Sequence, residues 1–205
     1  MRWLIALALT LGTFTAAEAD MYNGNETPAY TVETTDGAFE LRSYSPHIAA
    51  EVTVSGSRDA AINAGFRVLA GYIFGGNEAK AKVAMTTPVT QAPSEKIAMT
   101  TPVTQVESDQ GWTVQFMMPS EYTLDTLPKP KDNRIRFVTT DPVRMAVLRF
   151  SGIPTTAALA KRTDVLRAWA AAKGLTLTGA PQFMFYDPPF RMPWNRRNEV
   201  AFALK

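Results

Sequence analysis

The sequence predicts an α+β fold in which about eight antiparallel strands curl into a distorted barrel flanked by two helices. Two observations lead to this prediction. The order strand, Ser-Gly, helix, strand, strand occurs twice, over residues 48–118 and over residues 143–204. All connections between these elements are short, which is typical of one α+β domain built from two βαββ halves.

The strands are predicted from runs in which polar and apolar residues alternate, because successive side chains of a strand point to opposite faces. Asp36-Gly37 separates the first two runs and is a strong hairpin signal. Ser45-Pro46 and Asp141-Pro142 break the chain before two later runs. The expected strands lie at residues 30–35, 38–44, 48–55, 112–118, 134–140, 143–150, 182–186 and 198–204.

Two helices are predicted from apolar residues that recur at helical spacing. The first covers residues 58–74, with Ser57 as its N-cap and Gly75 at its end. The second covers about residues 156–173 and ends at Gly174. The side chains expected to face inward are Ile62, Phe66, Leu69 and Ile73 in the first helix, and Leu159, Val165, Leu166 and Trp169 in the second.

A decapeptide occurs twice between the first helix and residue 112. Residues 82–91 (KVAMTTPVTQ) return fourteen positions later as residues 96–105 (KIAMTTPVTQ), with nine of ten positions identical. The alternation predicts a strand in each copy, and the internal Pro confines that strand to an edge or a bulge. Only the second copy can lead directly into a hairpin with residues 112–118. We therefore expect the first copy to be an added arm or loop, with the alternative that the motif itself lines a site.

The first nineteen residues have the order of a secretory signal peptide. Arg2 precedes an uncharged, mostly apolar stretch over residues 3–16, and Ala17-Glu18-Ala19 offers small residues for cleavage. The apolar run is short for a membrane span, so we expect no stable span after processing, with an uncleaved anchor as the alternative. The expected domains are a signal peptide at 1–19 and a single domain at 20–205, exported to the periplasm.

Composition removes several classes of function. Cleavage takes away Arg2 and Glu18, so the net charge of +2 is unchanged and gives no warrant for a nucleic acid partner. One His and no Cys exclude the usual structural zinc sites, disulfides and any Cys nucleophile. No nucleophile-elbow pattern accompanies the single His, His47, and no glycine loop for phosphate opens a helix. We expect a protein that is not an enzyme.

Three segments together resemble the SOUL family of haem-binding proteins. They are FELRSY at residues 39–44, the AMTTPV block, and YDPP at residues 186–189 leading to RRNEV at residues 196–200. The resemblance implies a pair of βαββ units forming a distorted barrel. It also implies non-covalent, b-type binding of haem or another tetrapyrrole in a shallow apolar groove near the first helix.

Residues around the first helix are physically suited to such a ligand. Phe66, Leu69, Tyr72 and Ile73 offer apolar area for a porphyrin face, and the guanidinium groups of Arg58 and Arg67 match propionate carboxylates. His47 is the obvious iron ligand by chemistry, and Met85 or Met99 offers a thioether. Ordinary roles compete with each assignment, namely packing in the core or a solvated surface.

Two other functions remain open at this stage. A protein-interaction module would use the same groove for a partner helix. An enzyme acting on a small amphipathic ligand would need carboxylates with perturbed pKa values, and Glu51, Glu121 and Glu199 are the candidates. The charged residues from Arg196 to Glu199 also have a structural explanation, because they can tie Asp187 and the loop carbonyls and fix the register of the last strand.

Overall fold

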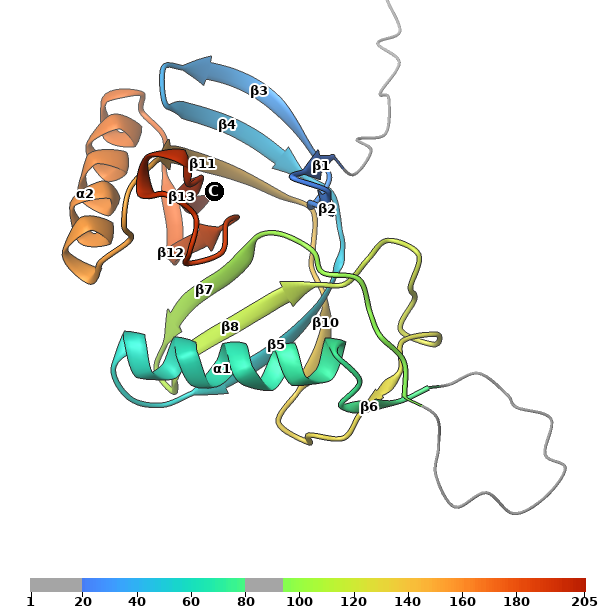
Figure 1. Cartoon of the computed structure of the whole chain (residues 1–205). Helices are drawn as coiled ribbons and strands as arrows, with labels where there is room; N and C mark the ends of the chain where they lie inside the picture. The colour runs from blue at the N-terminus through green and yellow to red at the C-terminus, as the bar shows by residue number, and fades with distance from the viewer. Residues whose placement is uncertain (1–19, 80–93) are drawn as a thin grey trace, which may run out of the picture.

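The structure is a computed structural model that describes residues 20–79 and 94–205 (Figure 1). The predicted signal peptide and the first copy of the decapeptide, with Met85, lie outside the described residues. The helices are α1 (Arg58–Ile73) and α2 (Thr156–Ala172), with a short 3-10 helix at Pro193–Asn195. The strands are β1 (Met21–Tyr22), β2 (Asn25–Glu26), β3 (Tyr30–Asp36), β4 (Phe39–Tyr44), β5 (Ile48–Val54), β6 (Asn77–Glu78), β7 (Val103–Ser108), β8 (Gly111–Met117), β9 (Lys129–Pro130), β10 (Arg136–Thr139), β11 (Val143–Phe150), β12 (Leu177–Phe185) and β13 (Asn198–Leu204).

The described chain forms one large antiparallel sheet, with two small two-stranded sheets beside it. Nine strands follow the order β10-β5-β8-β7-β12-β13-β11-β4-β3. The first βαββ half contributes β5-β8-β7 and the second contributes β12-β13-β11, so the order is symmetric about the β7–β12 pair. The predicted α+β fold with two βαββ halves is confirmed.

Each half passes one strand to the other half. β4 precedes β5 in the chain but pairs with β11, whereas β10 precedes β11 but pairs with β5. The links that make these crossings are residues 45–47 and 140–142, and they touch, because the Thr140 backbone N–H donates to the His47 carbonyl at 2.9 Å. A link of three residues spans at most about 14 Å. The two ends of the sheet are therefore drawn together and the sheet curls. It does not close into a complete barrel, because its edge strands β10 and β3 do not pair with each other.

The joints between strand and helix repeat in the two halves. Gly56 and Gly152 follow equivalent strands and have φ angles of 108° and 110°, which favour glycine. Ser57 and Thr155 precede the two helices, and only Thr155 caps with its side chain, accepting from the Ala158 N–H at 3.2 Å. Both helices end as predicted. Val165 was expected to face inward but is exposed, because it lies on the flank of α2 that turns away from the sheet.

The second decapeptide copy is only partly a strand. Residues 96–102 are irregular, and β7 begins at Val103, so the prediction of a regular strand through the copy is wrong. The reason is long-range contact: the Ile97 backbone N–H donates to the Ile73 carbonyl at 2.9 Å, and the Thr100 hydroxyl donates to the Met117 carbonyl at 2.6 Å. The predicted hairpin is confirmed, because β7 pairs with β8. β7 is an interior strand rather than an edge.

Both helices pack on the same face of the sheet. α1 covers a core that includes Ala50, Val52 and Val114, and α2 covers one that includes Ala146 and Phe202. The alternate residues of the strands point to the opposite face. There a third cluster gathers Met145, Val147, Met184, Ala201 and the aromatic rings of Tyr44 and Tyr186.

Candidate functional site

A hollow of about 480 Å³ lies along α1, between that helix and the segment that follows β9. Small-molecule sites commonly enclose roughly 300–1,000 Å³. The helix lines the hollow with Ala64, Arg67, Val68 and Gly71, and the facing segment contributes Ile135. A Cβ added at Gly71 would meet no atom within 4 Å, so the helix side of the hollow is open.

Cationic side chains surround this hollow. Arg67, Lys131 and Arg134 all line it, together with Asp132. Arg134 holds Asp132 through two hydrogen bonds of 3.0 and 2.7 Å, and these lower the pKa of Asp132 to about 2. Within residues 20–79 and 94–205, Arg67 and Lys131 contact no carboxylate; the Arg67 Nε donates to the Asn63 carbonyl at 3.2 Å. The hollow therefore offers an apolar wall and two positive charges not paired with a carboxylate.

Three of the residues predicted to contact a ligand belong to the core. Leu69, Tyr72 and Ile73 are buried beneath α1. Tyr72 also forms part of the hollow, but its hydroxyl donates to the Pro128 carbonyl at 2.9 Å. Burial raises the pKa of this hydroxyl above its ordinary value. Leu69 and Ile73 pack in the core beneath the hollow and do not line it.

Arg58 and Phe66 lie on the other flank of α1. Arg58 is largely buried between the two halves of the fold. It donates to the Gln105 side chain at 3.0 Å and lies over the rings of Phe183 and Phe185. Burial lowers its pKa, and its Nε has no partner within the described chain. Phe66 keeps 40% of its surface exposed. The structure therefore divides the predicted residues between two sides of one helix.

His47 and Met99 are separated from the hollow. His47 precedes β5, and the alternation of that strand puts it on the face of Ala49 and Glu51, opposite the residues that pack against α1. Its Nδ1 lies 3.1 Å from the Thr140 hydroxyl and 3.3 Å from the Ser45 carbonyl. Burial lowers the pKa of His47. Met99 is exposed on the irregular segment before β7.

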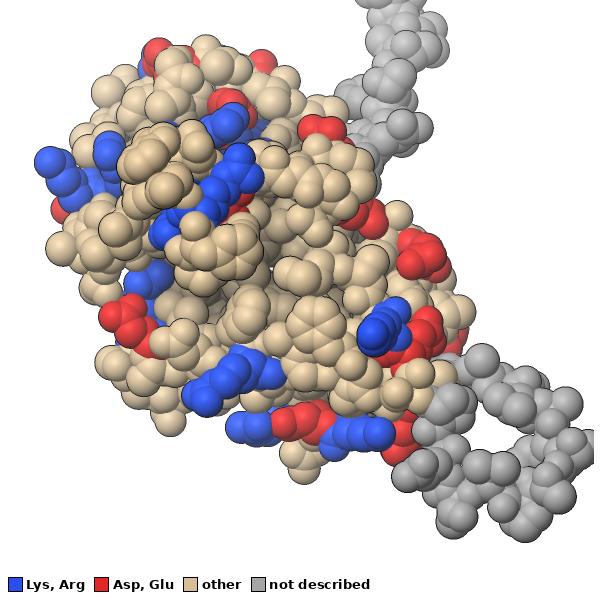
Figure 2. All heavy atoms as spheres, viewed as in Figure 1, with Lys and Arg blue, Asp and Glu red and all other residues tan. Residues whose placement is uncertain are grey.

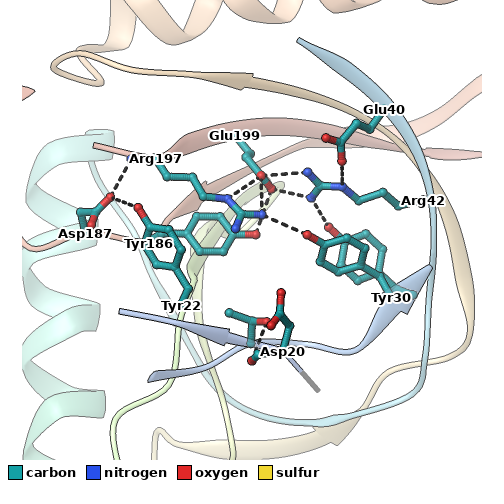
Figure 3. A network of polar contacts seen from close by, with 11 residues as sticks. Asp20, Tyr22, Tyr30, Glu40, Arg42, Tyr186, Asp187, Arg197 and Glu199 are labelled. Carbon is teal, nitrogen blue, oxygen red and sulfur yellow. Dashed lines mark hydrogen bonds and ion pairs between the residues drawn. The ribbon is translucent and has the colours of Figure 1, made fainter. Parts of the chain in front are cut away.

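A buried ionic network that the sequence did not reveal occupies the opposite face of the sheet (Figure 3). Glu199 has no exposed surface and accepts two hydrogen bonds from Arg42, of 2.8 and 3.0 Å. It also accepts from the Arg197 Nε at 2.9 Å and from the Tyr186 hydroxyl at 2.9 Å. Burial alone would raise the pKa of Glu199, but the two guanidinium groups outweigh it and lower the pKa.

The N-terminal hairpin β1–β2 packs against this network. Tyr22 meets Tyr186 edge to face at 5.5 Å, and the Arg197 guanidinium lies 3.9 Å from the Tyr186 ring centroid. Asp187 accepts from the Tyr22 hydroxyl at 3.0 Å and from the Arg197 backbone N–H at 2.6 Å. The expectation that the segment from Arg196 to Glu199 ties Asp187 and the loop carbonyls is confirmed, because Arg196 also donates to the carbonyls of Arg191 and Pro189.

The carboxylates proposed for an enzyme do not form a catalytic group. Glu199 is fully paired, and Glu51 accepts from Gln115 at 2.8 Å and from Arg136 at 3.0 Å. Glu121 lies in an exposed turn. Across residues 20–79 and 94–205, no group of three or more His, Asp or Glu side chains is arranged to bind a metal ion. The helices in the same part of the chain are too short or too polar to cross a membrane.

Comparison with known proteins identifies the family. The family model described as SOUL heme-binding protein matches residues 25–203. The chain belongs to the SOUL family. Heme-binding protein 1 of Xenopus laevis is 30% identical to this chain over 168 residues, which cover 80% of this chain and 83% of that protein. The resemblance drawn from the sequence motifs is confirmed.

Solved structures share the fold of this SOUL protein. A crystal structure titled as a hydrolase from Listeria innocua has a TM-score of 0.53 at 12% identity, covering 84% of this chain and 94% of that one. The EcmrR C-terminal domain has a TM-score of 0.52 at 13% identity, covering 86% and 98%. At such identities the likeness concerns the fold alone.

Proposed function

We propose that the protein binds haem or a related tetrapyrrole non-covalently, without catalysing a reaction, in the hollow beside α1. Membership of the SOUL family supports the class of ligand. The observation that carries the choice of site is the hollow itself, in which small side chains of α1 leave open space next to two cations without a carboxylate partner.

The described residues of the hollow suit the porphyrin ring and propionates of a haem, but they include no His or Met to ligate its iron. A flat ring can lie against Ala64, Val68 and Gly71, and burial of apolar area stabilises such a complex by roughly 25 cal/mol per Å². Arg67 can pair with one propionate through its guanidinium fork, and the Lys131 ammonium can pair with the other as a point charge. The described lining holds no His or Met, the side chains expected here as iron ligands. Binding should therefore depend on ring contact and propionate pairing.

Haem titration of the mature protein, followed by the Soret band, tests this proposal. We expect a dissociation constant in about the micromolar range, equivalent to roughly −8 kcal/mol. Gly71→Trp should fill the hollow and weaken binding at least about tenfold, a loss of about 1.4 kcal/mol. Gly71→Ala is the matched control at the same position, and Phe66→Glu is the control on the opposite flank of α1.

Each outcome of the titration has a clear meaning. If Gly71→Trp binds haem like the wild type while Phe66→Glu does not, the site lies on the Arg58 flank and the hollow is the wrong choice. If the wild type takes up no haem or other tetrapyrrole, the ligand class is wrong. Circular dichroism and thermal unfolding of each variant show whether α1 is intact.

We further propose that the protein is exported and that its mature form begins at Asp20. Residues 1–19 have the charge and hydropathy order of a cleaved signal peptide. The intact mass of protein purified from its own host tests this, and a mass that includes residues 1–19 would contradict it.

A further inference from the structure

The loop between β12 and β13 holds three large apolar side chains in water. Phe190 is 87% exposed, Trp194 is 69% exposed and Met192 is 57% exposed. All three lie within five consecutive residues of one loop, so this apolar tip concentrates exposed apolar surface at one end of the molecule. Exposed apolar groups gathered in this way mark sites of interaction with a ligand, a partner or a membrane.

This loop is held in place by polar contacts of its own. The Arg196 Nε donates to the Arg191 carbonyl at 2.8 Å, and the same guanidinium also donates to the Pro189 carbonyl. Arg191 is paired with Asp187 at 2.9 Å. The Asn195 N–H donates to the Met192 carbonyl at 2.9 Å. The apolar tip is thus presented by a fixed backbone.

The charge around the tip is positive. Arg196 belongs to the loop and has no carboxylate partner within the described chain, whereas Arg191 is balanced by Asp187, whose carboxylate is only 1% exposed and is also bonded to Tyr22 and Asn23. In Figure 2 basic side chains cross the region of this loop, mostly among uncharged atoms and with a little acidic surface beside them. The whole chain carries a net charge of only +2, so this is a local feature.

A second hollow, of about 350 Å³, opens beside Trp194. Arg149, Arg196 and Arg197 line it with Ser151, and its described lining includes no Asp or Glu. Arg197 is neutralised by Glu199. Arg149 is exposed, and within the described chain its side chain has no hydrogen-bond or ion-pair partner. Arg196 donates only to carbonyls. The hollow therefore suits an anionic oxygen group such as a phosphate.

We propose that this end of the molecule docks on the surface of a bilayer that contains anionic phospholipids. Phe190, Met192 and Trp194 enter the boundary between headgroups and acyl chains, where aromatic side chains are favoured. A headgroup phosphate occupies the hollow between Arg149 and Arg196. Apolar side chains among cations are the composition of surface-binding segments, whose attraction to anionic lipid adds to the apolar contact.

Charge and shape favour a bilayer over a protein partner. A stable protein interface needs about 800 Å² on each side, with shape complementarity across it. Here three apolar side chains project from one loop next to a hollow lined by cations. This arrangement suits a deformable anionic surface, which needs no fixed shape complementarity. This docking is independent of the hollow beside α1, because the two sites share no residue.

Vesicle binding by the mature protein tests the proposal. We expect sedimentation with vesicles of phosphatidylcholine and phosphatidylglycerol at 3:1, weakened by salt, and much weaker binding to phosphatidylcholine alone. The emission of Trp194 should shift to the blue on binding and become less quenched by acrylamide. Phe190→Ser with Met192→Ser should weaken binding about tenfold or more, and Arg149→Glu about fivefold or more.

Matched controls keep the outcome decisive. Val32→Ser removes another exposed apolar side chain, and Lys161→Glu reverses an exposed charge on α2; both should bind vesicles within about twofold of the wild type. Equal weakening by the controls, or no binding to anionic vesicles, would overturn the proposal. So would equally tight binding of soluble glycerol phosphate, of duplex DNA or of a protein partner through the same residues without vesicle binding.

Discussion

Replacing Glu199 by Gln tests whether the buried network is ionic and central to stability. Gln keeps the shape of the side chain but removes the charge that Arg42 and Arg197 share. Arg42 would retain the Glu40 carboxylate at 2.6 Å, whereas Arg197 would keep the Tyr30 hydroxyl at 3.3 Å and the ring of Tyr186 but no carboxylate. The variant therefore leaves a buried guanidinium without a carboxylate.

The expected loss in the free energy of unfolding is about 3–5 kcal/mol, the cost of removing one partner from a buried ion pair. This is a large share of a typical total of about 5–15 kcal/mol. With a denaturant slope of about 2 kcal/mol per M, the urea midpoint should fall by about 2 M. The matched control is Glu33→Gln, which breaks an exposed pair with Arg144 at 2.6 Å and should cost about 1 kcal/mol or less.

The pH dependence gives a second measurement. The pKa of Glu199 is lowered from its ordinary value of 4.5, so the folded protein holds the ionised form more strongly than the unfolded chain does. Its contribution to stability is fully present above about pH 4.5 and is lost as the pH falls through the folded-state pKa. The difference between wild type and Glu199→Gln should narrow over that acidic range. A variant within 1 kcal/mol of the wild type at pH 7, or a constant difference down to pH 3, would refute the reasoning.

Three further predictions follow from the described contacts. Gly65→Ala should lower the free energy of unfolding by about 1–3 kcal/mol, because the added Cβ would lie 2.7 Å from a methyl group of Val114. Gly71→Ala meets open space and should stabilise the protein by about 0.4–1 kcal/mol. Thermal unfolding measures both variants, and equal effects would contradict the packing argument. Deletion of residues 82–95 should leave one cooperative unfolding transition, because the second decapeptide copy forms the hairpin with β8; loss of cooperativity would mean that the first copy is required. His47→Ala should leave haem affinity and the Soret maximum unchanged, because His47 lies on the other face of the sheet from α1; a shifted maximum would show ligation.

Local patterns predicted most of the elements, because each depends on neighbours in the sequence. Alternation located the strands, and the glycines at residues 75 and 174 located the helix ends. The segment from 96 to 102 has the same alternation but is not a strand. Its backbone N–H groups instead donate to carbonyls of α1 and β2, and the Thr100 hydroxyl donates to a carbonyl of β8; such partners are set only by the tertiary fold.

The candidate site was predicted less well, for reasons that differ between residues. Leu69 and Ile73 were identified correctly as apolar residues of the first helix, but periodicity does not distinguish the side that packs on a sheet from the side that lines a hollow. Leu69→Glu would therefore unfold the core rather than report on a ligand. Arg67 lines the hollow, and its pairing with a propionate stays a prediction.

The ionic network was missed because hydropathy treats Arg42 and Glu199 as surface residues. A signal did exist in the alternation of the strands. Arg42 shares a face of β4 with Tyr44, and Glu199 shares a face of β13 with Ala201, so both belong to the face that the third cluster buries. Their pairing joins residues 157 positions apart, which no local pattern contains.

The exchange of β4 and β10 means that neither βαββ half is self-sufficient. The outer neighbour of β5 comes from the C-terminal half, and the outer neighbour of β11 comes from the N-terminal half. This is the geometry of a dimer whose subunits have swapped an arm, here contained in a single chain. Cleavage of the backbone in the exposed turn after β8 would therefore give two fragments that fold to the native structure only when they associate. Nascent chains face the same requirement, since β4 must wait for β11 to be synthesised before it can pair.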